Sequence, residues 1–184
     1  RGQRDRALLL FAWASGGRRR SEVSSADMRF LRAVNANEFI YTLAHSKTNQ
    51  SGTDTPENQK PVTGRAAQAL KTWLEAAQIV EGPLFRRIRK GGHMGEPLTP
   101  AAVRNIVKQR CELAGVEGDF SAHSLRSGFV TEAGRQNVPL PDTMALPGHH
   151  SVNTVLGCCR ADTALQNRAA RLLEPVPDKD KSAD

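Results

Sequence analysis

Most apolar residues of the chain recur at helical spacing. Residues 4–15 carry apolar side chains on most sides, which is typical of a buried helix, and Gly16-Gly17 is expected to end it. A second helix is expected over residues 63–78, capped by Thr63. One of its faces is apolar and is predicted to be buried: Ala66, Ala67, Leu70, Trp73, Leu74 and Ala77.

Two later helices begin at recognisable caps. Thr99 followed by Pro100 predicts a helix that ends at Ala114. Ser121 is predicted to cap the next helix, which ends before the prolines of residues 139–141. Their inward residues are predicted to be Val103, Ile106, Val107 and Ala114 in the first, and Leu125, Phe129, Val130 and Ala133 in the second.

Alternation of apolar and polar residues predicts one small sheet. Residues 38–44 alternate as a strand does, and Pro61-Val62 is the expected returning strand. The polar stretch 46–60 between them is expected to form a hairpin tip. The expected fold class is therefore mainly α with a small antiparallel β-sheet (α+β).

The C-terminal part is predicted to hold two short helices and a tail. The helices are expected at 151–158 and 163–173, and residues 174–184 are expected to be disordered. Residues 1–173 then form one domain without an internal repeat. Because Arg1 opens directly on charged, helix-like sequence, we expect the chain to be a fragment or a trimmed form of a longer protein.

Net charge and cysteine content limit the kinds of partner and the cellular location that we expect. The net charge is +7, with eight arginines against three acidic residues in 1–32 and seven Lys or Arg against Glu96 in 84–110. This favours a polyanionic partner, nucleic acid first, although a merely basic surface would look similar. With only 5% aromatic residues, contacts to a duplex backbone are favoured over base stacking. No apolar run could span a membrane, and three cysteines favour a reducing cytoplasm.

Four short motifs could carry chemistry. GGRRRSE (residues 16–22) is either a solvated loop or an anion site in which Glu22 supports an arginine from behind. SAHSLRSGF places His123 and Arg126 on one face near a helix start, where a capped surface helix is the plainer reading. The third motif is PGHHS (147–151), which taken alone predicts a turn with exposed histidines. The fourth is Lys47 in AHSKTNQ, which taken alone predicts a surface lysine.

The adjacent cysteines Cys158 and Cys159 raise the question of a metal or redox site. Adjacent residues on a helix point about 100° apart, and neither CxxC nor HxxxH spacing is present, which argues against zinc. A disulfide between neighbours would close a strained ring. We therefore predict no metal, and Cys159 has no role that the sequence assigns.

Taken together and in order, these motifs resemble the tyrosine recombinase (phage integrase) family, whose catalytic core is shared with type IB topoisomerases. The similarity runs through RDRALLLFAWASGGRRRSE, SKT, HSLRSGF and GHHSVNTVLG and covers residues 4–173. It implies the tyrosine recombinase catalytic-core fold. Residue by residue, it implies these catalytic positions: Arg19, Lys47, His123, Arg126 and His149. Arg18 and Arg20 are expected to touch the DNA backbone.

The resemblance also implies a reaction. A protein hydroxyl attacks a phosphodiester of double-stranded DNA, Arg19 and Arg126 clamp the non-bridging oxygens, and His149 donates a further hydrogen bond. His123 acts as acid or base and Lys47 protonates the leaving 5′ oxygen. The covalent 3′-phosphoryl intermediate conserves the bond energy, so no cofactor is expected.

The same resemblance implies an assembly on DNA. Family members usually carry an N-terminal helical domain that completes a clamp around the duplex, and it is absent from this chain. Residues 163–173 resemble the family's C-terminal helix, which predicts self-association on DNA. The expected location is the cytoplasm, associated with the nucleoid when DNA is bound, with no membrane contact.

The chain departs from the family at the nucleophile. The position expected to be tyrosine, nine residues after His149, is Cys158. Three accounts stay open: the thiolate attacks phosphorus, the protein binds DNA without cutting it, or the sequence is an altered form of an active enzyme. A cysteine side chain is shorter than tyrosine, and reaction geometry tolerates errors of only about 1 Å, so we expect impaired cleavage. The alternative is a non-catalytic DNA-binding protein derived from a recombinase.

Overall fold

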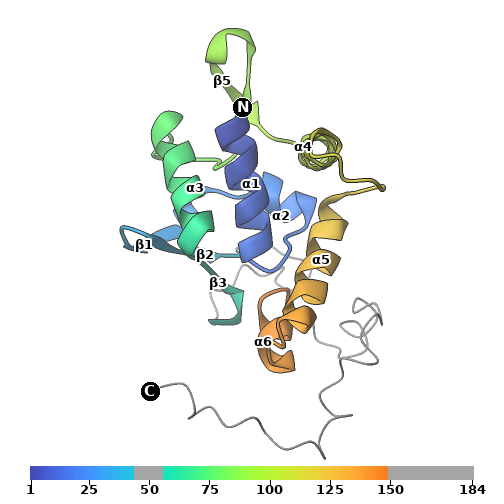
Figure 1. Cartoon of the computed structure of the whole chain (residues 1–184). Coiled ribbons are helices and arrows are strands. Elements are labelled where there is room, and N and C mark those ends of the chain that lie inside the picture. The colour runs from blue at the N-terminus through green and yellow to red at the C-terminus, as the bar shows by residue number, and fades with distance from the viewer. Residues whose placement is uncertain (44–55, 149–184) are drawn as a thin grey trace, which may run out of the picture.

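The computed structural model describes residues 1–43 and 56–148 (Figure 1). The predicted hairpin tip, the two C-terminal helices and the tail fall wholly or mostly outside the described residues. What is described is mainly helical with small antiparallel sheets, which confirms the predicted fold class. Within it, no helix combines the length and apolar character needed to cross a membrane.

The first helix forms the centre of the fold. α1 (Gly2–Ala14) lies between α3 (Gly64–Ala76) and α5 (Ala122–Arg135) (Figure 1). One side of it is fully buried, through Ala7, Leu8, Phe11 and Ala12. Partly buried apolar residues on the other side also pack against the core: Leu9, Leu10 and Ala14. The helices predicted over 4–15 and 63–78 are thus confirmed, with ends that differ by at most two residues. Thr63 does precede α3, but its side chain makes no cap hydrogen bond, so the predicted cap was wrong in that respect.

A three-stranded antiparallel sheet lies beside α1 and α3. Its strands, in spatial order, are β1 (Leu31–Asn35), β2 (Glu38–Thr42) and β3 (Gln59–Val62). The register places Tyr41 opposite Lys60. β2 and β3 are the predicted strands. β1 was not predicted, because four of its five residues are exposed and so show no apolar alternation.

A second sheet, also not predicted, is a two-stranded hairpin next to the N-terminus (Figure 1). It consists of β4 (Arg86–Ile88) and β5 (Met94–Pro97), joined through the 3-10 turn Lys90–Gly92. Arginines and glycines dominate this stretch, so hydrophobic patterning gave no strand signal. Two further 3-10 turns are Met28–Phe30 and Pro56–Asn58.

Aromatic packing joins the sheet to the central helix. The ring of Phe11 packs edge-on against Tyr41 and Phe85, with centroids 5.1 and 5.6 Å apart. Trp73 of α3 donates its indole N–H to the carbonyl of Leu84 at 2.8 Å. These contacts fix α3 and the sheet against α1 and leave the opposite side of α1 for α5.

The remaining helices follow the predicted caps. Thr99 Oγ1 accepts the Ala102 amide at the start of α4 (Pro100–Leu113), and Ser121 Oγ accepts the His123 amide at the start of α5. The predicted inward residues Val103, Ile106 and Val107 are buried. Ala114 is exposed, so that prediction was wrong: it lies past the last turn of α4. The short helices are α2 (Arg20–Ser24) and α6 (Leu140–Ala145).

Candidate nucleic-acid interface

A two-glycine turn brings the arginine motif against α5. Gly16 and Gly17 have φ values of +93° and +70°, which favour glycine. A Cβ atom on Gly17 would lie 2.2 Å from Cα of Arg126. The absence of a side chain therefore lets the backbone of the turn touch the backbone of α5, and this contact sets how far Arg19 lies from Arg126.

A cleft of about 510 Å3 opens where this turn, α4 and the start of α5 meet. It brings together the predicted residues Arg19, His123 and Arg126, although they are far apart in sequence. Arg20 also lines it. The other lining residues are Gly17, Ser21, Arg104, Asp119 and Ser121.

His123 and Arg126 lie on the same side of α5, as their three-residue spacing predicts. The His123 side chain is exposed, whereas Arg126 is 8% exposed and still reaches the cleft. Arg126 donates from Nη2 to the carbonyl oxygen of Pro147 at 2.6 Å. Val130 and Ala133, four and seven residues after Arg126 on the same side of α5, are buried, so apolar packing holds this side of the helix against the protein.

Glu22 contacts both Arg18 and Arg19 of the arginine motif. Its Oε2 accepts the backbone amide of Arg19 at 3.0 Å and lies 3.6 Å from Nη1 of Arg18. The carboxylate thus holds the backbone of Arg19 and pairs with the guanidinium of Arg18.

Arg18 does not face the cleft. It is 2% exposed and donates from Nη2 to the carbonyl oxygen of Leu146 at 2.6 Å. Burial lowers the pKa of Arg18 to about 10, against the opposing attraction of Glu22. This placement corrects the expectation that Arg18 touches the DNA backbone, because a buried guanidinium offers no surface to it. Arg19 and Arg20, in contrast, are exposed.

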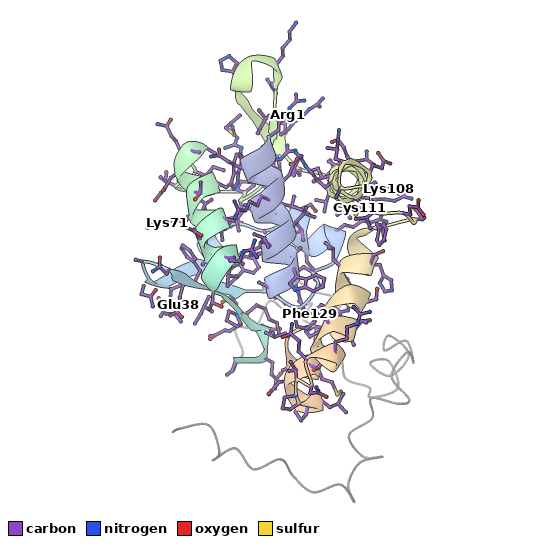
Figure 2. All side chains as sticks on the ribbon, in the orientation of Figure 1. Arg1, Glu38, Lys71, Lys108, Cys111 and Phe129 are labelled. Carbon is purple, nitrogen blue, oxygen red and sulfur yellow. The ribbon has the colours of Figure 1, made fainter. Side chains whose placement is uncertain are left out.

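The cleft is strongly cationic. Four arginines line it (Arg19, Arg20, Arg104, Arg126), against the single carboxylate of Asp119. Asp119 lies 2.6 Å from Nζ of Lys108 on α4, whose hydrogen bond lowers the pKa of the Asp119 carboxyl. Lys108 is labelled in Figure 2. Sequence reasoning missed Arg104 and Asp119, although Arg104 belongs to the basic stretch 84–110.

Three predicted site residues, Lys47, His149 and Cys158, lie outside the described residues. The single tyrosine of the chain, Tyr41, is described and lies in the core with 3% of its surface exposed. Burial raises its pKa to about 12. Tyr41 therefore takes no part in the cleft. No cluster of three or more His, Cys, Asp or Glu suited to a metal occurs among residues 1–43 and 56–148.

Sequence comparison finds relatives over most of the chain. The sequence model of the phage integrase family matches residues 1–158. An integrase/recombinase xerD homolog of Selenomonas ruminantium is 34% identical over 160 residues, which are 84% of this chain and 46% of that protein. Tyrosine recombinase XerC of Herpetosiphon aurantiacus is 29% identical, over 83% of this chain and 46% of its own length. The chain thus spans less than half of these relatives.

Solved structures share the fold. XerH recombinase bound to its difH substrate superposes with a TM-score of 0.67 at 20% identity, over 95% of this chain and 48% of that one. XerA recombinase gives a TM-score of 0.69 at 17% identity, over 95% and 58% of the two chains. A lambda integrase fragment bound to a core site gives 0.62 at 15% identity, over 88% and 53%. These likenesses confirm the predicted catalytic-core fold.

Proposed function

The chain belongs to the phage integrase family of tyrosine recombinases, and from this premise we propose that it is the catalytic domain of a site-specific DNA recombinase. Its partner is double-stranded DNA, and the cleft between α2, α4 and α5 receives the phosphate at which a strand is cut and rejoined. Activity of the whole protein would need the part of the relatives that this chain does not span.

One observation carries this proposal: Arg19, His123 and Arg126 line one cleft although 107 positions separate Arg19 from Arg126 in the sequence. Two guanidinium groups offer forked donors that suit the non-bridging oxygens of a phosphate. The cleft is open to solvent on the side of Arg19 and Arg20, so a duplex backbone can approach it. The nearby imidazole of His123 can exchange a proton there.

The reaction would proceed by in-line displacement. A protein hydroxyl at the nucleophile position would give its proton to His123 as its oxygen bonds to phosphorus. The bond to the 5′ oxygen breaks at the same time, and Lys47 supplies the proton to that oxygen. Arg19 and Arg126 neutralise the charge that gathers on the equatorial oxygens. The 3′-phosphoryl protein intermediate is then attacked by a 5′ hydroxyl, which restores the DNA backbone.

We further propose that cleavage by this chain is impaired, because Cys158 stands at the nucleophile position. The buried Tyr41 supports this: it is the only tyrosine in the chain and does not line the cleft. The same observation favours the second candidate function, a DNA-binding protein derived from a recombinase that no longer cuts.

Covalent trapping on a nicked duplex tests both candidates. The chain as it is should retain duplex binding and form little adduct, whereas Cys158→Tyr should form a 3′-phosphoryl adduct. The matched control is Cys158→Tyr combined with Arg126→Ala. It should bind duplex DNA more weakly but still measurably, and at saturating DNA it should trap far less, because one lost donor to the transition state costs about 100-fold or more in rate.

Two outcomes would count against these proposals. If the unaltered chain forms an adduct that Cys158→Ala abolishes, the thiolate is a competent nucleophile and impairment is wrong. If neither the unaltered chain nor Cys158→Tyr binds duplex DNA at low salt, the recombinase proposal fails for this domain.

A further inference from the structure

Three cations from separate parts of the chain converge on the end of α6. They meet three consecutive carbonyl oxygens, one each. The bonds are Lys60 Nζ to Ala145 O at 2.8 Å, Arg18 Nη2 to Leu146 O at 2.6 Å, and Arg126 Nη2 to Pro147 O at 2.6 Å. We call these six residues the carbonyl clamp.

The C-terminal end of a helix needs donors of this kind. The last carbonyls of a helix have no partner within it, and α6 has no basic residue in its own last turn. β3, the turn before α2, and α5 each supply one donor instead. Lys60 also donates to the carbonyl of Glu57 at 2.7 Å, which ties the start of β3 to the same point.

These donors are costly to bury. Arg18, Lys60 and Arg126 are 2%, 3% and 8% exposed, and Glu22 is the buried carboxylate among them. Burial first, and then the charge of Arg18, lower the pKa of Lys60 to about 8. Apolar residues could fill such a site at equal or better stability. Because burying three cations costs free energy, we infer that the fixed position of these carbonyl oxygens serves a purpose other than stability.

The backbone of the glycine turn reinforces the clamp. A Cβ atom on Gly16 would lie 2.5 Å from the carbonyl carbon of Leu146, and one on Gly17 would lie 2.2 Å from Cα of Arg126. The turn therefore touches both α6 and α5. The end of α6 has little room to shift unless Arg126 shifts as well.

We propose that Lys60 and Arg18 are positioning residues for the DNA-cleaving site. They hold the end of α6, and its Pro147 carbonyl in turn holds the guanidinium of Arg126 in the cleft. Neither residue lines the cleft, so neither touches the phosphate. The proposal rests on the proposed function for the role of Arg126, and it adds two residues that act on Arg126 through the backbone.

A comparison of stability with DNA affinity tests this. Lys60→Met relieves a buried charge, fills the same space and removes the donor to the carbonyls of Ala145 and Glu57. Because these effects oppose each other, the free energy of unfolding should change little, whereas duplex affinity should fall by about tenfold or more, the worth of one charged hydrogen bond. Lys60→Arg keeps a charged donor and should restore affinity. Lys71→Met, on the outer side of α3 (Figure 2), is the matched control and should change neither quantity.

The pH profile adds a signature that a merely structural lysine lacks. The charged groups facing Lys60 are Arg18, Glu22, Arg126 and Glu57. A DNA phosphate at Arg126 should favour the charged form of Lys60, so duplex affinity should fall as pH rises through about 8. In Lys60→Met this step should be absent.

A measurement without DNA separates this proposal from the proposed function. In 15N-arginine NMR spectra, the guanidinium signals of Arg126, assigned with Arg126→Lys, should be sharp in the unaltered chain and averaged in Lys60→Met. Unchanged Arg126 signals would overturn the positioning role, even if DNA binding is found. Parallel losses of stability and affinity in Lys60→Met would also overturn it, because they describe a structural residue. If the Arg126 signals are sharp in the unaltered chain and averaged in Lys60→Met, but the chain binds no DNA, the proposed function fails and the positioning of Arg126 by Lys60 stands.

Discussion

Three consecutive arginines, Arg18, Arg19 and Arg20, have the same side chain but opposite surroundings. Arg18 is 2% exposed and its guanidinium contacts Glu22 and the end of α6. Arg19 and Arg20 are exposed and line the cleft. One turn of backbone thus supplies Arg18 to the carbonyl clamp on the inside, and Arg19 and Arg20 to the cleft on the outside that we propose to bind phosphate.

The difference shows that charge alone does not assign a role. A guanidinium inside the protein acts on geometry, since it must satisfy fixed acceptors or lose free energy. A guanidinium at the surface contributes little to stability and remains available to an anion. Arg126 belongs to both regions, because it lines the cleft and also holds the Pro147 carbonyl.

The largest effect should come from breaking the contact that joins the two regions. Gly17→Ala places a Cβ atom 2.2 Å from Cα of Arg126 at a φ of +70°, so backbone must move. We expect the free energy of unfolding to fall by about 3 kcal/mol or more, and duplex affinity to fall even where the protein stays folded. Chemical denaturation and a binding titration measure these.

Gly64→Ala is the matched control for that substitution. Gly64 has a φ of +54°, and a Cβ atom added there would meet no other atom within 4 Å, so alanine brings strain without a clash. Its cost should be about 1 kcal/mol, with no change in affinity. Equal costs for Gly17→Ala and Gly64→Ala would show that the contact between the turn and α5 is not tight.

The next effect separates the inner from the outer arginine. Arg18→Ala leaves a cavity and an unpaired carbonyl on Leu146, so we expect a loss of about 2 kcal/mol in stability. Arg19→Ala should change stability by less than about 0.5 kcal/mol and weaken duplex binding by about tenfold. An unchanged free energy of unfolding in Arg18→Ala would contradict the contacts of Arg18 with Leu146 and Glu22 inside the protein.

Stability should also depend on pH through Lys60. Its pKa is about 8 in the folded protein and 10.5 in the unfolded chain, so between these values the unfolded chain binds more protons and stability rises with pH. The gain should be up to about 2 kcal/mol between pH 8 and 10. Tyr41 acts oppositely above pH 10, because its pKa is raised from 10.0 to about 12. In chemical denaturation, the free energy of unfolding of Lys60→Met should not rise between pH 8 and 10. That of Tyr41→Phe should not decline above pH 10.

Sequence patterns predicted α4 and α5 well because each of these helices had two independent signals. α4 and α5 combined a cap, at Thr99 and Ser121, with an apolar face, and both caps are formed. β1 and the β4–β5 hairpin lacked an apolar face and were missed. Local spacing carries no information on strands whose pairing, not burial, holds them in place.

Motifs in the sequence predicted which side chains would meet in the cleft. Arg19, His123 and Arg126 were predicted from motifs and are brought into one cleft. The inward direction of Arg18 was not predictable, because it depends on the Gly16–Gly17 turn and on carbonyls 128 positions away in the chain. Lys60 gave no signal for the same reason, since its acceptor on α6 is 85 positions away.

The smallest effect concerns the one carboxylate on the outer side. Asp119 is exposed and paired with Lys108, and an exposed ion pair adds little to stability. Asp119→Asn should leave stability unchanged, remove repulsion from phosphate and release Lys108 toward the duplex. We expect duplex affinity to rise about threefold at low salt and the gain to shrink as salt rises, because added ions screen exposed charges.

The control is Glu112→Gln, because Glu112 is an exposed carboxylate on α4 that does not line the cleft. An equal gain in both variants would mean that net charge, and not the charge of the cleft, governs DNA binding. The difference between the inner and outer arginines would then have no consequence for DNA binding.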